Sequence, residues 1–67
     1  MRNNIKKYRK ILKLRQQDLA ESIQTTRQTI ILIEAGKQDP SLKLAFKLAK
    51  LFNCKIEDLF TADNKSF

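Results

Sequence analysis

The sequence contains no histidine and no tryptophan, and only one cysteine, one tyrosine, one glycine and one proline. Without histidine, metal sites and general acid–base catalysis lose their commonest side chain. The single cysteine, Cys54, cannot form an internal disulfide, and we interpret it as a small buried apolar residue. We therefore expect neither an enzyme nor a metal site, and we expect no cofactor or small-molecule ligand.

Long apolar runs are also missing, which predicts that no segment spans a membrane. The first ten residues, MRNNIKKYRK, lack the apolar centre of a signal peptide, so we expect a cytoplasmic protein. The 67 residues provide material for one small domain. We place this domain at residues 1–62 and expect residues 63–67 to form a flexible tail.

Positive charge is abundant and unevenly distributed. The chain has 14 basic and 7 acidic residues, a net charge of +7. Residues 1–33 hold eight basic and two acidic residues, or +6, whereas residues 34–67 hold six and five, or +1. A one-sided basic field favours a polyanionic partner, of which nucleic acid is the commonest. The alternative is a solvated basic surface that has no ligand.

Apolar residues recur at spacings of three and four, which predicts an all-α fold. We expect five helices, at about residues 4–12, 16–23, 27–35, 42–52 and 56–60. The residues expected to face the interior are Ile5, Tyr8, Leu12, Leu19, Ala20, Ile23, Ile30, Ile33, Leu42, Ala45, Leu48, Ala49 and Phe52.

The ends of these helices carry recognisable signals. Thr26 and Ser41 are of the type that caps a helix N-terminus. Gly36 and Asn53 suit the left-handed residue that ends a helix. Pro40 prevents the third helix from continuing into the fourth.

The short connection between the second and third helices suits a helix-turn-helix, in which the second helix of the motif enters the major groove of DNA. The stretches QQDLAESI, TRQTIILIEAGK, DPSLKLAFKLAKLF and KIEDLF resemble the phage lambda repressor-like family, also called the XRE family, over residues 4–60. This resemblance implies a compact five-helix domain that binds double-stranded DNA and regulates transcription as a repressor. It also implies a bacterial or phage-type, nucleoid-associated protein that binds near-palindromic operators as a homodimer.

The resemblance further implies the roles of individual residues. Arg9 and Glu34 match a structural ion pair of the family, although charge alone would have made Arg9 a phosphate contact. Gln16 matches the first residue of the second helix, which contacts a backbone phosphate, and Lys37 matches a basic residue of the following loop. The full set of expected phosphate contacts is Arg15, Gln16, Gln17, Thr26 and Lys37.

Four positions depart from the family pattern. Lys13 and Gln24 stand where glycine is usual, and a side chain in left-handed geometry costs on the order of 1 kcal/mol. Arg15 and Lys55 stand where serine or threonine usually caps a helix, a loss of about 1 kcal/mol each. We expect a domain that is less stable than relatives with the usual residues.

The expected base-reading residues lie on one side of the third helix, because residues four apart are one turn apart. Arg27 can bind guanine and Gln28 can bind adenine in the major groove. Ile31 and Leu32 cannot form a hydrogen bond with a base edge, but they can contact the methyl group of thymine. Two further interpretations stay open: an apolar contact with a protein partner, and packing of Leu32 against the second helix.

These alternatives define a rival function, a protein-interaction module of the antitoxin or anti-repressor type that uses the apolar face of the third helix. Leu44, Leu51 and Phe60 are more apolar than a solvated surface requires. They either complete the core or contribute to a dimer contact.

Overall fold

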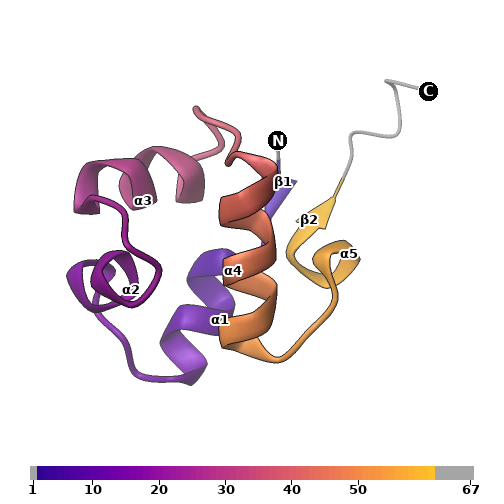
Figure 1. Ribbon diagram of the computed structural model, residues 1–67, viewed down its shortest axis with the longest axis horizontal. Helices are drawn as coiled ribbons and strands as arrows, with labels where there is room; N and C mark the ends of the chain where they lie inside the picture. The colour runs from indigo at the N-terminus through magenta and orange to yellow at the C-terminus, as the bar shows by residue number, and fades with distance from the viewer. Residues whose placement is uncertain (1, 62–67) are drawn as a thin grey trace.

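The computed structural model describes residues 2–61; the predicted tail, residues 63–67, lies outside this range. The helices are α1 (Ile5–Ile11), α2 (Gln16–Ser22), α3 (Arg27–Glu34), α4 (Leu42–Phe52) and α5 (Ile56–Leu59). In Figure 1, α2 and α3 lie at one end of the molecule and α5 at the other, with α1 and α4 between them. The predicted all-α, five-helix domain is confirmed.

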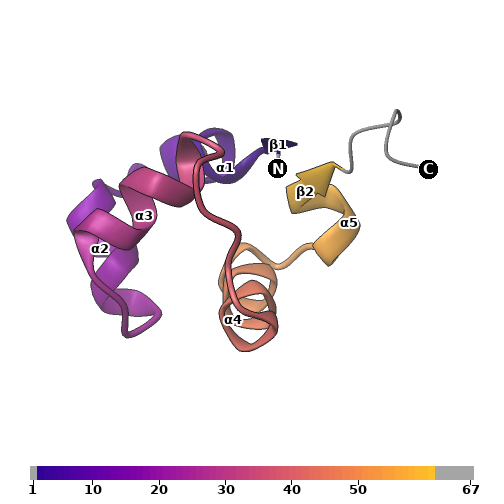
Figure 2. The same cartoon turned by 90° about the horizontal axis from the view of Figure 1, so that it is seen from above.

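The two ends of the described chain pair with each other, a contact that no feature of the sequence predicted. Strand β1 (Arg2–Asn3) runs antiparallel to β2 (Phe60–Thr61). Both strands lie beside α5, away from α2, in the two views of Figures 1 and 2. The fifth helix therefore ends one residue earlier than expected, because Phe60 adopts extended backbone angles, with φ −120° and ψ 130°.

The core is one cluster of apolar side chains to which all five helices contribute. Its buried members are Ile5, Leu19, Ala20, Ile23, Ile30, Ile33, Leu48, Ala49, Phe52 and Leu59. The ring of Tyr8 stacks on Phe52, with 5.5 Å between the ring centroids. The helical periodicity therefore identified most of the interior.

Two residues expected to be buried are exposed. The exposed fraction is 48 % for Leu12 and 69 % for Leu42. Leu12 lies just beyond the last residue of α1, where the chain turns away from the core. Leu42 is the first residue of α4, and the buried stripe of that helix begins one turn later, at Ala45. Both predictions were wrong because an apolar stripe read from spacing does not show where the neighbouring helices stop covering it.

For three apolar residues the sequence left two interpretations open, the core or a dimer contact, and the surroundings of these residues differ. Leu44 and Phe60 are partly buried and pack against the core. Leu51 is 37 % exposed. Leu44 and Phe60 therefore contribute to the core, whereas Leu51 remains at the surface.

The expected caps at α3 and α4 are present. The hydroxyl oxygen of Thr26 accepts a hydrogen bond from the backbone N–H of Thr29 at 3.2 Å. The hydroxyl oxygen of Ser41 accepts one from the N–H of Leu44 at 3.1 Å. Each cap satisfies one of the N–H groups that the first turn of a helix leaves without an intrahelical partner.

At α2 and α5, where the usual capping residue is absent, an aspartate partly replaces it. The carboxylate of Asp18 accepts a hydrogen bond from the backbone N–H of Arg15 at 2.9 Å. The carboxylate of Asp58 does the same for the N–H of Lys55, also at 2.9 Å. These contacts are the returning half of a capping box, so part of the expected loss is offset.

Four helix ends use left-handed backbone geometry, and only one of them has glycine. The φ angle is 59° at Lys13, 61° at Gln24, 53° at Asn53 and 75° at Gly36. The turn at Gln24 has additional support from α4, because the ammonium group of Lys47 donates a hydrogen bond to the Gln24 side-chain oxygen at 2.8 Å. The predicted geometry of both departures from glycine is confirmed.

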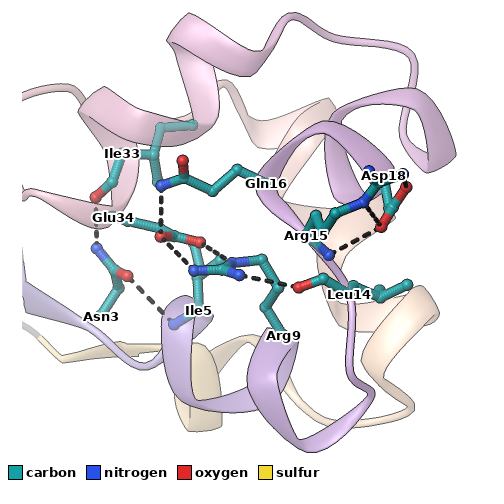
Figure 3. Close-up of polar contacts among 9 residues, drawn as sticks. All are labelled: Asn3, Ile5, Arg9, Leu14, Arg15, Gln16, Asp18, Ile33 and Glu34. Carbon is teal, nitrogen blue, oxygen red and sulfur yellow. Dashed lines mark hydrogen bonds and ion pairs between the residues drawn. The ribbon is translucent and has the colours of Figure 1, made fainter.

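The buried charges of the domain lie between α1 and α3 (Figure 3). The Nε atom of Arg9 is 2.7 Å from Oε2 of Glu34, and the two side chains are only 10 % and 6 % exposed. A second guanidinium nitrogen, Nη1, donates to the carbonyl oxygen of Leu14 at 2.9 Å. The predicted pairing of Arg9 with Glu34 is present, and it also holds the segment between α1 and α2.

We predict that Lys13→Gly stabilises the domain by up to about 1 kcal/mol, because it removes the side chain that disfavours the left-handed region. Lys13→Ala is the matched control, because it removes the same charge but keeps the Cβ atom. Urea unfolding of both variants measures the difference. Equal stability of the glycine and alanine variants would contradict the prediction.

We predict that Arg9→Met costs about 3–5 kcal/mol of unfolding free energy, since it leaves the buried Glu34 carboxylate without its cation. Arg15→Met is the control, because its ion pair with Asp18 is exposed and its loss has little effect. The double variant Arg9→Met/Glu34→Met should recover most of the stability in the same unfolding experiment. Similar losses of unfolding free energy in Arg9→Met and Arg15→Met would argue against a structural role for Arg9.

Candidate nucleic-acid interface

The position of α3 relative to α2 is set by a short turn. The N–H of Thr25 donates to the carbonyl oxygen of Ala20 at 2.8 Å, and the N–H of Gln24 donates to that of Glu21 at 3.3 Å. These hydrogen bonds satisfy carbonyl groups that the end of α2 would otherwise leave unpaired. The Thr26 cap then starts α3 at the next residue, Arg27.

The inner face of α3 is buried and its outer face carries the predicted base-reading residues. Ile30 and Ile33 have exposed fractions of 0 % and 1 %. Arg27 and Gln28, in the first turn, are exposed. Within residues 2–61, neither of these two side chains has a hydrogen-bond or ion-pair partner. Their donors are therefore available to an external ligand.

Ile31 and Leu32 are less exposed than the sequence pattern suggests. Both side chains are partly buried. The carbonyl oxygen of Leu32 accepts hydrogen bonds from the N–H groups of Lys37 at 2.9 Å and Gln38 at 3.3 Å, which closes the end of α3 against the following loop. The apolar part of the outer face is thus small, which leaves less area for a purely apolar partner.

The predicted phosphate-contacting glutamines already have partners inside the protein. The side-chain N–H of Gln16 donates to Oε1 of Glu34 at 3.2 Å (Figure 3). The side-chain N–H of Gln17 donates to Oε2 of Glu21 at 3.1 Å. These hydrogen bonds fix the orientation of both amides, and each amide keeps a carbonyl oxygen and a second N–H.

Arg15 is held by an acidic neighbour. Its Nε atom lies 3.0 Å from Oδ2 of Asp18, and its side chain is 82 % exposed (Figure 3). The hydrogen bond from Arg15 lowers the pKa of the Asp18 carboxyl, and the same hydrogen bond raises the pKa of Arg15. Asp18 therefore stays ionised at neutral pH and competes with an external anion for this guanidinium.

The remaining two predicted phosphate contacts differ from each other. Thr26 uses its hydroxyl group to cap α3 and also to contact the hydroxyl group of Thr29 at 2.9 Å. Lys37 is exposed in the loop after α3.

A shallow hollow brings part of the predicted set together. Its walls are formed by Lys6, Arg9, Arg15, Gln16, Gln17 and Arg27. The hollow thus unites three predicted phosphate contacts with one predicted base contact, and it adds Lys6 of α1. Thr26, Lys37 and the other residues of the α3 outer face do not line it.

Two residues near this interface were not singled out from the sequence. Lys6 is one of three lysines in α1, and no feature of the sequence distinguishes it from Lys7 or Lys10. Lys47 reaches from α4 to Gln24 and also to the carbonyl oxygen of Ile23, at 3.4 Å. Their roles depend on contacts between distant segments, which spacing does not show.

The described part of the chain offers little material for catalysis. Residues 2–61 contain no group of three or more side chains placed to hold a metal ion. Burial raises the pKa of the Cys54 thiol, and burial also raises the pKa of Tyr8 beside it. A thiol with a raised pKa is a poor nucleophile at neutral pH.

No helix within residues 2–61 is long and apolar enough to span a membrane.

Comparison with known proteins places the chain in a family. The family model described as helix-turn-helix matches residues 5–59. A protein of Methanocaldococcus jannaschii is 60% identical over 60 residues, which cover 90% of this chain and 91% of that protein. A protein of Archaeoglobus fulgidus is 46% identical over 65 residues, covering 97% and 92%.

A third relative, YgzD of Bacillus subtilis, is 39% identical over 66 residues, covering 98% of this chain and 100% of that protein. All three relatives are named as HTH-type transcriptional regulators. Because they come from archaea as well as a bacterium, the expectation of a bacterial or phage-type protein is not supported. The chain belongs to the XRE-type helix-turn-helix family, a class of DNA-binding domains and not of enzymes, as its sequence predicted.

Proposed function

We propose that this chain is a sequence-specific, double-stranded DNA-binding transcriptional regulator, acting as a repressor, that reads the major groove with α3. The observation that carries the proposal is the exposure of Arg27 and Gln28 in the first turn of α3, without a partner in residues 2–61. Both side chains form bidentate hydrogen bonds with base edges, arginine with guanine and glutamine with adenine. The names of the relatives support a role in transcription.

The proposed phosphate contacts come from the start of α2, the turn before α3 and the loop after α3. We assign Arg15, Gln16, Gln17, Thr26 and Lys37 to backbone phosphates, which fix the register of a protein on DNA without reading its sequence. Ile31 and Leu32, partly buried on the same helix, add contacts with thymine methyl groups. The chain acts in the cytoplasm at the nucleoid, and it binds as a homodimer to two half-sites about one turn of DNA apart.

The test is selection from a random duplex DNA pool with the purified chain near physiological salt, where nonspecific attraction is weakened. We expect enrichment of a paired half-site that contains A·T positions, and the spacing of the half-sites reports the dimer. Failure to enrich any sequence, together with strong sequence-blind binding at low salt, would overturn the proposed specificity.

We predict that Arg27→Ala weakens binding to the selected site by about 1–3 kcal/mol and relaxes the preference at one base pair. Lys55→Ala is the control, because it removes the same charge at the start of α5, at the other end of the molecule (Figure 1). Fluorescence anisotropy with the selected duplex measures both affinities. Equal losses in the two variants would show that only overall charge matters.

The rival protein-interaction module predicts a different pattern. In that case Arg27→Ala would leave function intact, whereas Leu32→Asp would abolish it. The rival requires a larger apolar contact than thymine methyl groups do, so the partial burial of both Ile31 and Leu32 disfavours it.

A further inference from the structure

The hollow beside α3 is lined by residues of three helices. Lys6 and Arg9 come from α1, Arg15 to Gln17 from the start of α2, and Arg27 from the start of α3. Four of its six lining residues are cations and the other two are amides. A hollow of this composition suits an anion that accepts several hydrogen bonds.

Two of the four cations are neutralised inside the protein. Arg9 is paired with Glu34 at 2.7 Å, and Arg15 with Asp18 at 3.0 Å. Lys6 and Arg27, in contrast, have no acidic partner within residues 2–61. Two uncompensated positive charges therefore line one hollow, from two different helices.

We propose that Lys6, from α1, adds a contact with the DNA backbone phosphate that the proposed function assigns to Gln16 and Gln17 in the same hollow. This proposal rests on the proposed function, because it concerns the same DNA interface. Arg27 belongs both to the hollow and to the first turn of α3, so a bound duplex that reaches α3 passes over the hollow. The DNA footprint of the chain thus extends beyond the helix-turn-helix to α1.

The fixed position of Arg9, one of the residues that line the hollow, strengthens this assignment. Arg9 is held by Glu34 and by the carbonyl oxygen of Leu14 at 2.9 Å. Because Lys6 precedes Arg9 by about one turn on the same helix, the backbone of Lys6 is held at a constant place relative to α3. A side chain on a fixed backbone loses less conformational entropy on binding than one in a loose segment.

The neighbouring Lys7 provides a matched control. It is equally cationic and exposed and lies in the same helix, but it does not line the hollow. We would measure the dissociation constant for duplex DNA at several salt concentrations for the wild type, Lys6→Gln and Lys7→Gln. Both variants have the same net charge and substitute an exposed position, and circular dichroism melts verify that both are folded.

Lys6→Gln should weaken binding roughly fivefold and lower the magnitude of the slope of log affinity against log salt by about 0.9, the value for one lost phosphate contact. Lys7→Gln should leave the slope close to that of the wild type, and Lys6→Arg should retain the wild-type slope.

If Lys6→Gln and Lys7→Gln have equal slopes while the wild type selects a sequence, the inference about Lys6 is wrong and the proposed function stands. If the wild type binds no duplex, both proposals are overturned. If it binds without sequence preference, the difference between the slopes still decides whether Lys6 contacts phosphate.

Discussion

The N–H groups of a buried guanidinium need hydrogen-bond acceptors, and in this domain Arg9 of α1 finds them in two other segments. It binds the carboxylate of Glu34 at the end of α3 and the carbonyl oxygen of Leu14 before α2. The same carboxylate accepts the amide of Gln16, the first residue of α2. One charged cluster thereby sets the relative positions of α1, α2 and α3. The cost of leaving any of these groups unpaired restricts the arrangements open to the helix-turn-helix.

Local features of the sequence were sufficient to predict the helices and most of the core. Apolar spacing and the caps at Thr26 and Ser41 placed α3 and α4, and the departures at Lys13 and Gln24 have the left-handed geometry expected of them. Features that depend on distant segments were missed. These features are the pairing of β1 with β2, the exposure of Leu42, and the position of Lys6, which lines the hollow while Lys7 and Lys10 do not. Each of them depends on how far other elements of the fold extend.

The internal hydrogen bonds of the proposed interface bear on specificity. Gln16, Gln17 and Arg15 are each held by an acidic residue, so their side chains are oriented before any ligand arrives. The carboxylates also reduce the net attraction for phosphate, because each cation that they neutralise adds less to the general field. Arg27 and Gln28 lack such partners within residues 2–61. The interface thus combines a restrained phosphate surface with base-reading side chains whose donors are free.

The pairing of β1 with β2 brings the two ends of the described chain together beside α5, away from α2 and the start of α3 (Figures 1 and 2). A dye, an affinity handle or a fused protein attached at Arg2 or at Thr61, the ends of the described chain, would therefore leave the domain from the same edge. That edge lies away from the first turn of α3 (Figures 1 and 2). Immobilisation through either of these two positions would consequently leave α3, the proposed base-reading helix, accessible to a duplex in solution.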